Sequence, residues 1–127
     1  MSEARQAMSQ TLGIQAHWLE AQVYRALASP TRLAILCALT QGERCVNELT
    51  DLLRLPQPTV SRHLRVLHDA LLVNATRHGQ NVVYTLSDQR ICQVIELLRN
   101  VSCDVIVKSA RDFGALPRRK KSKNTLS

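Results

Sequence analysis

The sequence lacks the motifs on which most classes of enzyme depend. Its glycines are too few and too scattered for a glycine-rich phosphate loop; they are Gly13, Gly42, Gly79 and Gly114. Neither a His-Glu-x-x-His metal motif nor a Gly-x-Ser-x-Gly nucleophile turn occurs among the 127 residues. We therefore predict that the protein is not an enzyme and that it uses no cofactor.

Long apolar runs are also missing from the sequence. No run approaches the length needed to span a bilayer, and residues 1–6 lead into no apolar signal-peptide core. These two absences predict a cytoplasmic protein that does not act in a membrane. Its four cysteines are then expected to be thiols with sensing, metal-binding or packing roles, because permanent disulfides are rare in a reducing compartment.

Positive charge is abundant but unevenly placed. The formal net charge is +7 and the sequence pI is near 9.8, which favours an anionic partner such as nucleic acid. Five of the 17 basic residues and none of the 10 acidic ones lie in the last eleven residues, so the remainder has a net charge of only +2. We predict a flexible N-terminal arm (1–12), one domain (13–112) and a basic disordered tail (113–127). A DNA-contacting arm and a simple solubility segment are equally compatible with the tail.

The apolar spacing of the domain predicts four helices in its first half. Residues 14–28 form the first, and Ser29-Pro30 gives the second an N-cap followed by proline at its first position. A short third helix begins near Val46 and ends before Pro56, and the fourth follows at once. Two short helices joined by a tight break are typical of a helix-turn-helix.

The fourth predicted helix has the two faces that a DNA-recognition helix needs. Val60, Leu64 and Leu67 recur at the spacing of a buried stripe, which leaves the polar residues on the other face. Those available to a DNA groove are Gln57, Thr59, Ser61, Arg62, His63 and Arg65. We therefore predict that the protein binds duplex DNA.

The residues after Asp69 change to a β-strand pattern. Segments 72–77 and 81–86 are rich in β-branched residues and flank Gly79, which predicts a hairpin, or wing. Apolar residues then recur at helical spacing from Ile91 to Val105 in a long last helix. The expected fold is thus mainly α with a small β-hairpin wing, a winged helix-turn-helix in the order α-α-α-α-β-β-α. At this chain length a homodimer through the first and last helices is expected.

Three segments together resemble the ArsR/SmtB family of bacterial repressors. They are residues 26–36 (ALASPTRLAIL), residues 56–67 (PQPTVSRHLRVL) and the hairpin end at residues 83–88 (VYTLSD). The resemblance implies a dimeric repressor that leaves its operator when a metal, metalloid or thiol-reactive signal binds. Pro56 departs from the serine cap of many members, which should weaken that helix start by roughly 1 kcal/mol.

The predicted DNA contacts follow from side-chain chemistry. Gln57 can pair with adenine, Arg62 or Arg65 with guanine or a phosphate, and Thr59 and Ser61 with bases or backbone oxygens. Arg77 and Gln80 at the wing tip are weaker candidates, since hairpin turns are commonly polar. A twofold dimer would place its recognition helices in successive major grooves, so the operator should be an inverted repeat.

The cysteines carry the prediction about the signal. Arsenic sensors of the family often have Cys-Val-Cys at the third helix, but here Cys45-Val46-Asn47 lacks the second thiol. Cys37 and Cys103 instead match the two positions used by the persulfide- and redox-sensing SqrR/BigR/HlyU subgroup. By this resemblance, reactive sulfur species or oxidants would link the Cys37/Cys103 dithiol and release the DNA.

Two alternatives remain open. One is that As(III) or a heavy metal binds thiolates supplied by Cys45, Cys92 and Cys103. A zinc site on the last helix, where zinc sensors of the family place their histidines, is not expected, because all four histidines precede that helix. The other alternative is a protein-interaction winged helix with nonspecific nucleic-acid binding. Each cysteine is also compatible with a simple packing role.

Overall fold

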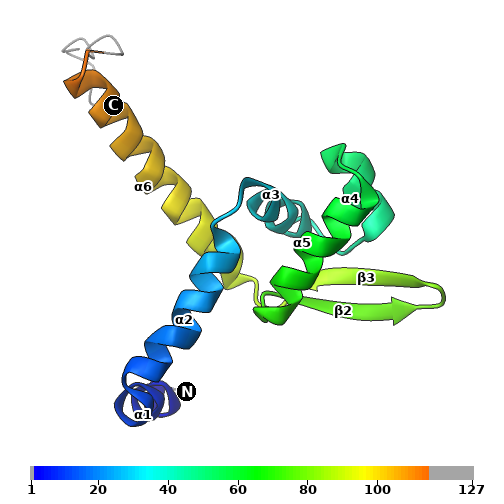
Figure 1. Ribbon diagram of the computed structural model, residues 1–127, viewed down its shortest axis with the longest axis horizontal. Coiled ribbons are helices and arrows are strands. Elements are labelled where there is room, and N and C mark those ends of the chain that lie inside the picture. Colours follow the sequence, from blue (N-terminus) through cyan, green and yellow to red (C-terminus); the bar gives the residue numbers. More distant parts are fainter. Residues whose placement is uncertain (1, 115–127) are drawn as a thin grey trace. The chain divides into compact units, whose positions relative to one another are not determined.

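The computed structural model describes residues 2–114, and it divides into two compact units, with Cys92 ending the first and Gln93 beginning the second. Its elements in chain order are α1 (Ser2–Leu12), α2 (Ile14–Leu27), α3 (Pro30–Leu39), β1 (Arg44–Cys45), α4 (Val46–Leu53), α5 (Gln57–Asp69), β2 (Val73–His78), β3 (Asn81–Leu86) and α6 (Arg90–Asp112) (Figure 1). Helix α2 begins one residue after the predicted domain boundary at 13, α6 ends at Asp112, and the two units divide within α6, so the predicted domain (13–112) stays a prediction. Most of the predicted tail, residues 115–127, lies outside the described residues.

The segment expected to be a flexible arm is helical from Ser2 to Leu12, and its flexibility stays a prediction. Residues 2–12 contain no glycine or proline and are mostly good helix formers, with Glu3 in the first turn. Gly13 then has a φ of 51°, a backbone conformation that favours glycine, and separates α1 from α2. The sequence pattern missed α1 because this segment has no strong apolar stripe.

Helices α3, α4 and α5 enclose the core of the first unit. Ile35 and Leu36 of α3, Leu49 of α4 and the α5 stripe have no exposed surface. The stripe consists of Val60, Leu64 and Leu67, as the sequence predicts. The predicted N-cap of α3 is also confirmed, since the Ser29 hydroxyl accepts a hydrogen bond from the Arg32 N–H at 3.3 Å.

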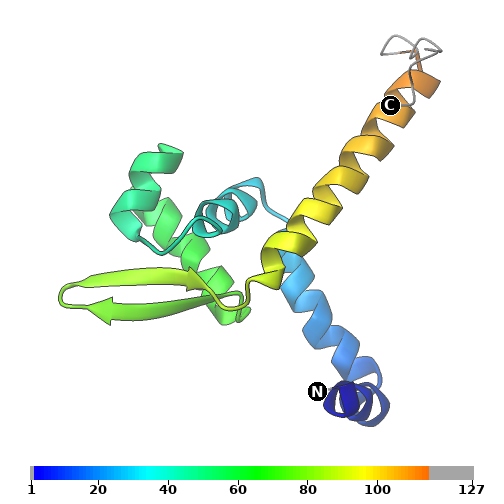
Figure 2. The same ribbon diagram turned by 180° about the vertical axis from the view of Figure 1, so that it is seen from behind.

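The sheet contains one strand more than the predicted hairpin. Its order is β1-β3-β2, all antiparallel, with Arg44 opposite Tyr84 and Cys45 opposite Val83. The predicted wing is confirmed, and Gly79, with a φ of 64°, begins its two-residue loop. Figure 1 shows α3, α4 and α5 grouped beside this hairpin, and Figure 2, seen from behind, shows its loop end extending past them.

The last helix, α6, is long and carries a continuous apolar stripe. Asp88 precedes it and accepts a hydrogen bond from the Arg90 N–H at 2.8 Å. The apolar residues that α6 leaves about half exposed or more follow helical spacing; they are Val94, Leu97, Leu98, Val101, Val105 and Ile106. Within residues 2–114 no helix is long and apolar enough to cross a membrane.

Candidate nucleic-acid interface

The polar face of α5 is the strongest candidate for a nucleic-acid interface. It lies opposite the buried stripe, and Gln57, Arg62 and Arg65 are exposed on it, whereas Thr59 and Ser61 are half-buried. No acidic residue occurs between Asp51 and Asp69. A helix of this kind fits the width of a DNA major groove, and its arginines supply donors for guanine edges and phosphates.

One pair on this face is already ordered by a hydrogen bond. The side-chain amide of Gln57 donates to the Ser61 hydroxyl at 2.9 Å, one turn further along α5. Gln57 also lies in the first turn, where Pro56 provides no side-chain cap, as expected from the proline at that position. The hydrogen bond to Ser61 limits the rotamers of Gln57 and so reduces the entropy lost when it pairs with a base.

His63 has a different environment from the other predicted base-reading residues. It is half-buried, and its Nδ1 lies 3.1 Å from Nη1 of Arg32 on α3. Burial lowers the pKa of the His63 imidazole, and the charges of Arg32 and Arg62 lower it further. Because an arginine can only donate, Nδ1 can accept this hydrogen bond only when the ring is neutral, which the lowered pKa favours. His63 thus has a partner within the protein, and its DNA contact stays a prediction.

Two arginines near this face were not predicted as site residues. Arg54 is exposed at the turn between α4 and α5, with a φ of 56°, and nothing in the local sequence distinguishes it from a solvated surface residue. Arg32 is half-buried beneath α5 and bonds to it through His63. The sequence did place Arg32 within the family-like Ser-Pro-Thr-Arg segment, but that signal did not indicate a partner.

The wing presents the other two predicted residues to solvent. Arg77 lies near the end of β2, opposite Val82, and Gln80 lies in the loop. Both side chains are exposed. An exposed hairpin with a basic residue near its tip can contact a phosphate or a minor groove beside a recognition helix.

The four cysteines differ in exposure. Cys103 on α6 is exposed, whereas Cys37 on α3, Cys45 before α4 and Cys92 on α6 are half-buried. Cys37 belongs to the first compact unit and Cys103 to the second. The Cys92 thiol lies 3.8 Å from the side-chain oxygen of Gln89, to which it can donate.

Cys45 is the N-cap of α4 and bonds to an acidic residue in the first turn of that helix. Its backbone N–H donates to Oε1 of Glu48 at 3.0 Å, and this bond is the main cause of the lowered pKa of the Glu48 carboxyl. Among the residues that the structure describes, no three His, Cys, Asp or Glu side chains are grouped so that they could hold a metal ion. The three-thiolate alternative therefore finds no preassembled site.

Comparison with known proteins relates this chain to a family of bacterial regulatory proteins. Residues 29–75 match the model of the bacterial regulatory protein arsR family. The chain is 43% identical over 74 residues to the transcriptional repressor SmtB of Mycobacterium tuberculosis, and the match covers 58% of this chain and 55% of SmtB. It thus spans about half the length of that relative. It is also 42% identical over 79 residues to the transcriptional activator HlyU of Vibrio cholerae, covering 62% of this chain and 73% of HlyU.

Solved structures agree with this assignment. HlyU from Vibrio cholerae has a TM-score of 0.62 at 37% identity, covering 70% of this chain and 97% of HlyU, and reduced HlyU has a TM-score of 0.61. A homodimeric winged helix-turn-helix DNA-binding domain from Mycobacterium bovis has a TM-score of 0.68 at 28% identity, covering 75% of this chain and 88% of the domain. The fold is therefore the predicted winged helix-turn-helix, and these relatives are transcriptional regulators rather than enzymes. The chain belongs to the ArsR family of bacterial regulatory proteins.

Proposed function

We propose that this protein is a dimeric transcriptional repressor that binds an inverted-repeat operator through α5 and the wing. The observation that carries the proposal is the α5 face on which Gln57, Arg62 and Arg65 are exposed, held in place by a fully buried stripe on the opposite side. Thr59, Ser61, Arg77 and Gln80 complete the proposed DNA contacts. The homodimeric M. bovis relative supports a twofold arrangement.

The first experiment selects operator sequences from a randomised duplex pool and measures binding by fluorescence anisotropy over a range of salt concentrations. We expect the selected sequences to be inverted repeats with half-sites about one helical turn apart. A residue that reads a base should cost about 1–3 kcal/mol of operator affinity when changed to alanine, and Gln57→Ala and Arg65→Ala test this. Loss of a phosphate contact, in contrast, should lower by about one the slope of log affinity against log salt concentration, called the salt slope below.

The matched control is Arg5→Ala, which removes the same charge from an exposed position on α1. It should leave operator affinity unchanged. Binding of any duplex with equal affinity, and no inverted repeat among the selected sequences, would replace our proposal with a protein-interaction winged helix that binds nucleic acid nonspecifically.

We further propose that a Cys37/Cys103 dithiol is the signal receiver. Cys103 is the exposed one of the four cysteines, so an external reagent meets it most readily. Its thiolate would attack an organic persulfide, releasing the organic thiol and leaving a persulfide on Cys103. Attack by the Cys37 thiolate would then form the Cys37–Cys103 disulfide and release hydrogen sulfide. With peroxide as oxidant, the same disulfide forms with two molecules of water.

Intact mass, with and without DTT, tests this step after separate exposure of the reduced protein to an organic persulfide, peroxide and As(III). We expect a reversible internal disulfide and loss of operator binding in the wild type, and neither in Cys37→Ser or Cys103→Ser. Cys45→Ser and Cys92→Ser serve as controls that should respond like the wild type. Release by As(III) alone, retained in Cys37→Ser but lost in Cys45→Ser or Cys92→Ser, would show a metalloid sensor instead.

A further inference from the structure

The Arg32 side chain joins three helices of the first unit. It extends from the first turn of α3, and its Nε donates to the Ala26 carbonyl at 2.6 Å while Nη2 donates to the Arg25 carbonyl at 3.2 Å. Both carbonyls belong to the last turn of α2, and the Arg25 carbonyl also accepts a hydrogen bond from the Ala28 N–H at 3.1 Å. The remaining nitrogen, Nη1, lies 3.1 Å from Nδ1 of His63 on α5. One guanidinium thus bonds the end of α2 to the recognition helix.

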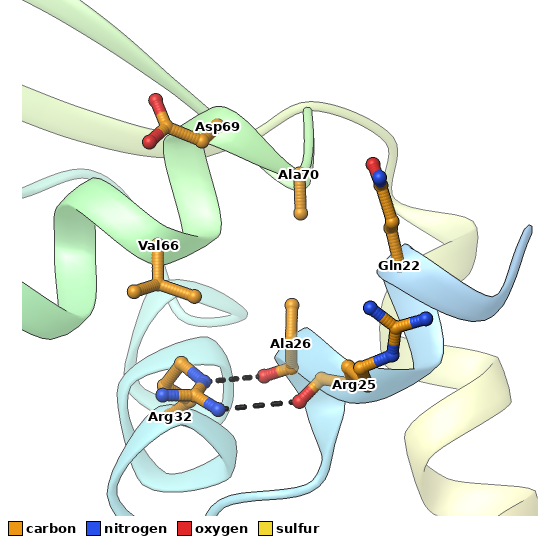
Figure 3. A pocket seen from close by; sticks show the side chains of 7 residues that line it. All are labelled: Gln22, Arg25, Ala26, Arg32, Val66, Asp69 and Ala70. Carbon is orange, nitrogen blue, oxygen red and sulfur yellow. Dashed lines mark hydrogen bonds between the residues drawn. The ribbon is translucent and has the colours of Figure 1, made fainter. Parts of the chain in front are cut away.

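Packing between α2 and α5 is incomplete beside this residue. A cleft of about 320 Å³ lies there, and Figure 3 shows at its edge the two Arg32 hydrogen bonds to the Ala26 and Arg25 carbonyls. The cleft is lined by Gln22, Arg25, Ala26, Arg32, Val66, Asp69 and Ala70. Because side chains do not fill this space, apolar contact alone leaves α5 less constrained against α2, and the directional bonds of Arg32 contribute more to its orientation.

We propose that Arg32 is a positioning residue for operator recognition, which fixes α5 against the end of α2 without contacting DNA. The inference rests on the proposed DNA-binding function of α5. Three of the five N–H donors of Arg32 are engaged inside the protein. Since α2 is one of the two helices expected to form the dimer, the same bonds link the dimer contact to the orientation of the recognition helix.

The three bonds require the planar fork of an arginine. A lysine at this position keeps the charge but offers a single ammonium, which cannot reach two carbonyls of α2 and a ring nitrogen of α5 from fixed directions. His63 must be neutral to accept from Nη1, and its lowered pKa keeps it in that form. Both partners of the contact can therefore be tested separately.

The test compares Arg32→Lys, Arg32→Ala and His63→Leu with the wild type in full-length protein. We expect each to lower affinity for the selected operator at least tenfold, with little change in affinity for unrelated duplex DNA. The salt slope should stay the same, because no phosphate contact is lost. His63→Gln, which keeps an acceptor oxygen, should restore part of the affinity. Arg25→Lys is the matched control, since only the backbone carbonyl of Arg25 takes part.

Several outcomes would overturn the inference. Operator affinity unchanged in Arg32→Lys would show that the fork is not needed, and a salt slope lowered by about one would make Arg32 a phosphate contact. If Arg32→Ala does not fold, the operator affinities of Arg32→Lys and His63→Leu test the inference, and circular dichroism confirms that these two variants are folded. An Arg32→Lys/His63→Leu double variant whose operator affinity equals that of either single variant supports a shared contact, whereas additive losses of affinity contradict it. Failure of the wild type to prefer any operator would instead reject the proposed function.

Discussion

Leu71 has an unusual backbone conformation for its residue type. Its φ is 63°, in the left-handed region, directly after α5. The Leu71 N–H donates to the His68 carbonyl and the Leu72 N–H to the Leu67 carbonyl, both at 3.0 Å, which is the helix end that glycine usually provides. The leucine side chain is 80% exposed and so gains little from packing to offset the strain.

We predict that Leu71→Gly stabilises the protein by about 0.5–1 kcal/mol, since glycine adopts this conformation without a steric cost. Chemical denaturation at fixed protein concentration measures the change in free energy of unfolding. Leu71→Ala is the control, because it shortens the side chain but keeps the Cβ atom that causes the strain. Equal stability of the glycine and alanine variants would show that the backbone is not strained there.

His63 gives the protein a pH-dependent stability. Its folded-state pKa is lowered by burial and by Arg32 and Arg62, so the unfolded chain takes up a proton at higher pH than the folded one. The stabilisation is therefore fully present above the ordinary pKa of 6.5 and is lost as the pH falls through the folded-state value. We expect the free energy of unfolding to decrease as the pH is lowered below 6.5, and to decrease less in His63→Gln. Parallel pH profiles for the two proteins would disprove the assignment to His63.

At the scale of elements, the features that depend on residues close in the sequence could be predicted from the sequence. The Ser29 cap, the Pro56 break and the buried stripe from Val60 to Leu67 each act within one or two turns, and all are confirmed. Strand β1 could not be predicted this way, because its two residues pair with β3 about 40 positions later. The Arg32–His63 contact likewise joins residues 31 positions apart, so His63 was assigned from its helical position to the DNA-reading face.

The wing should add affinity without sequence preference. Arg77 is exposed near the hairpin tip, where a guanidinium can reach a phosphate beside the groove occupied by α5. We predict that Arg77→Ala weakens binding to all duplexes by a similar factor and lowers the salt slope by about one. Asn74→Ala, an exposed position on the same strand, should change neither quantity. An affinity loss confined to the selected operator would instead indicate that Arg77 reads bases.

At the scale of the whole molecule, two helices leave several large apolar residues exposed. On α2, Ile14, Trp18 and Leu19 are each more than half exposed, and so are Leu97 and Leu98 on α6. Large exposed apolar patches mark interaction surfaces. The sequence predicted these two helices as the dimer contact from their apolar spacing, and their exposure in a single chain supports that proposal.

A charge placed on the exposed apolar face of α6 should therefore dissociate the dimer. We predict that Leu98→Glu raises the dimer dissociation constant more than about 100-fold, because burying an unpaired carboxylate costs roughly 3 kcal/mol or more. Sedimentation equilibrium measures the constant directly. Leu52→Glu, at a similarly exposed apolar residue of α4, is the control and should remain dimeric. Because each monomer offers only one recognition helix, Leu98→Glu should also bind a single half-site as well as the full inverted repeat. An intact dimer in this variant would place the dimer contact away from α6.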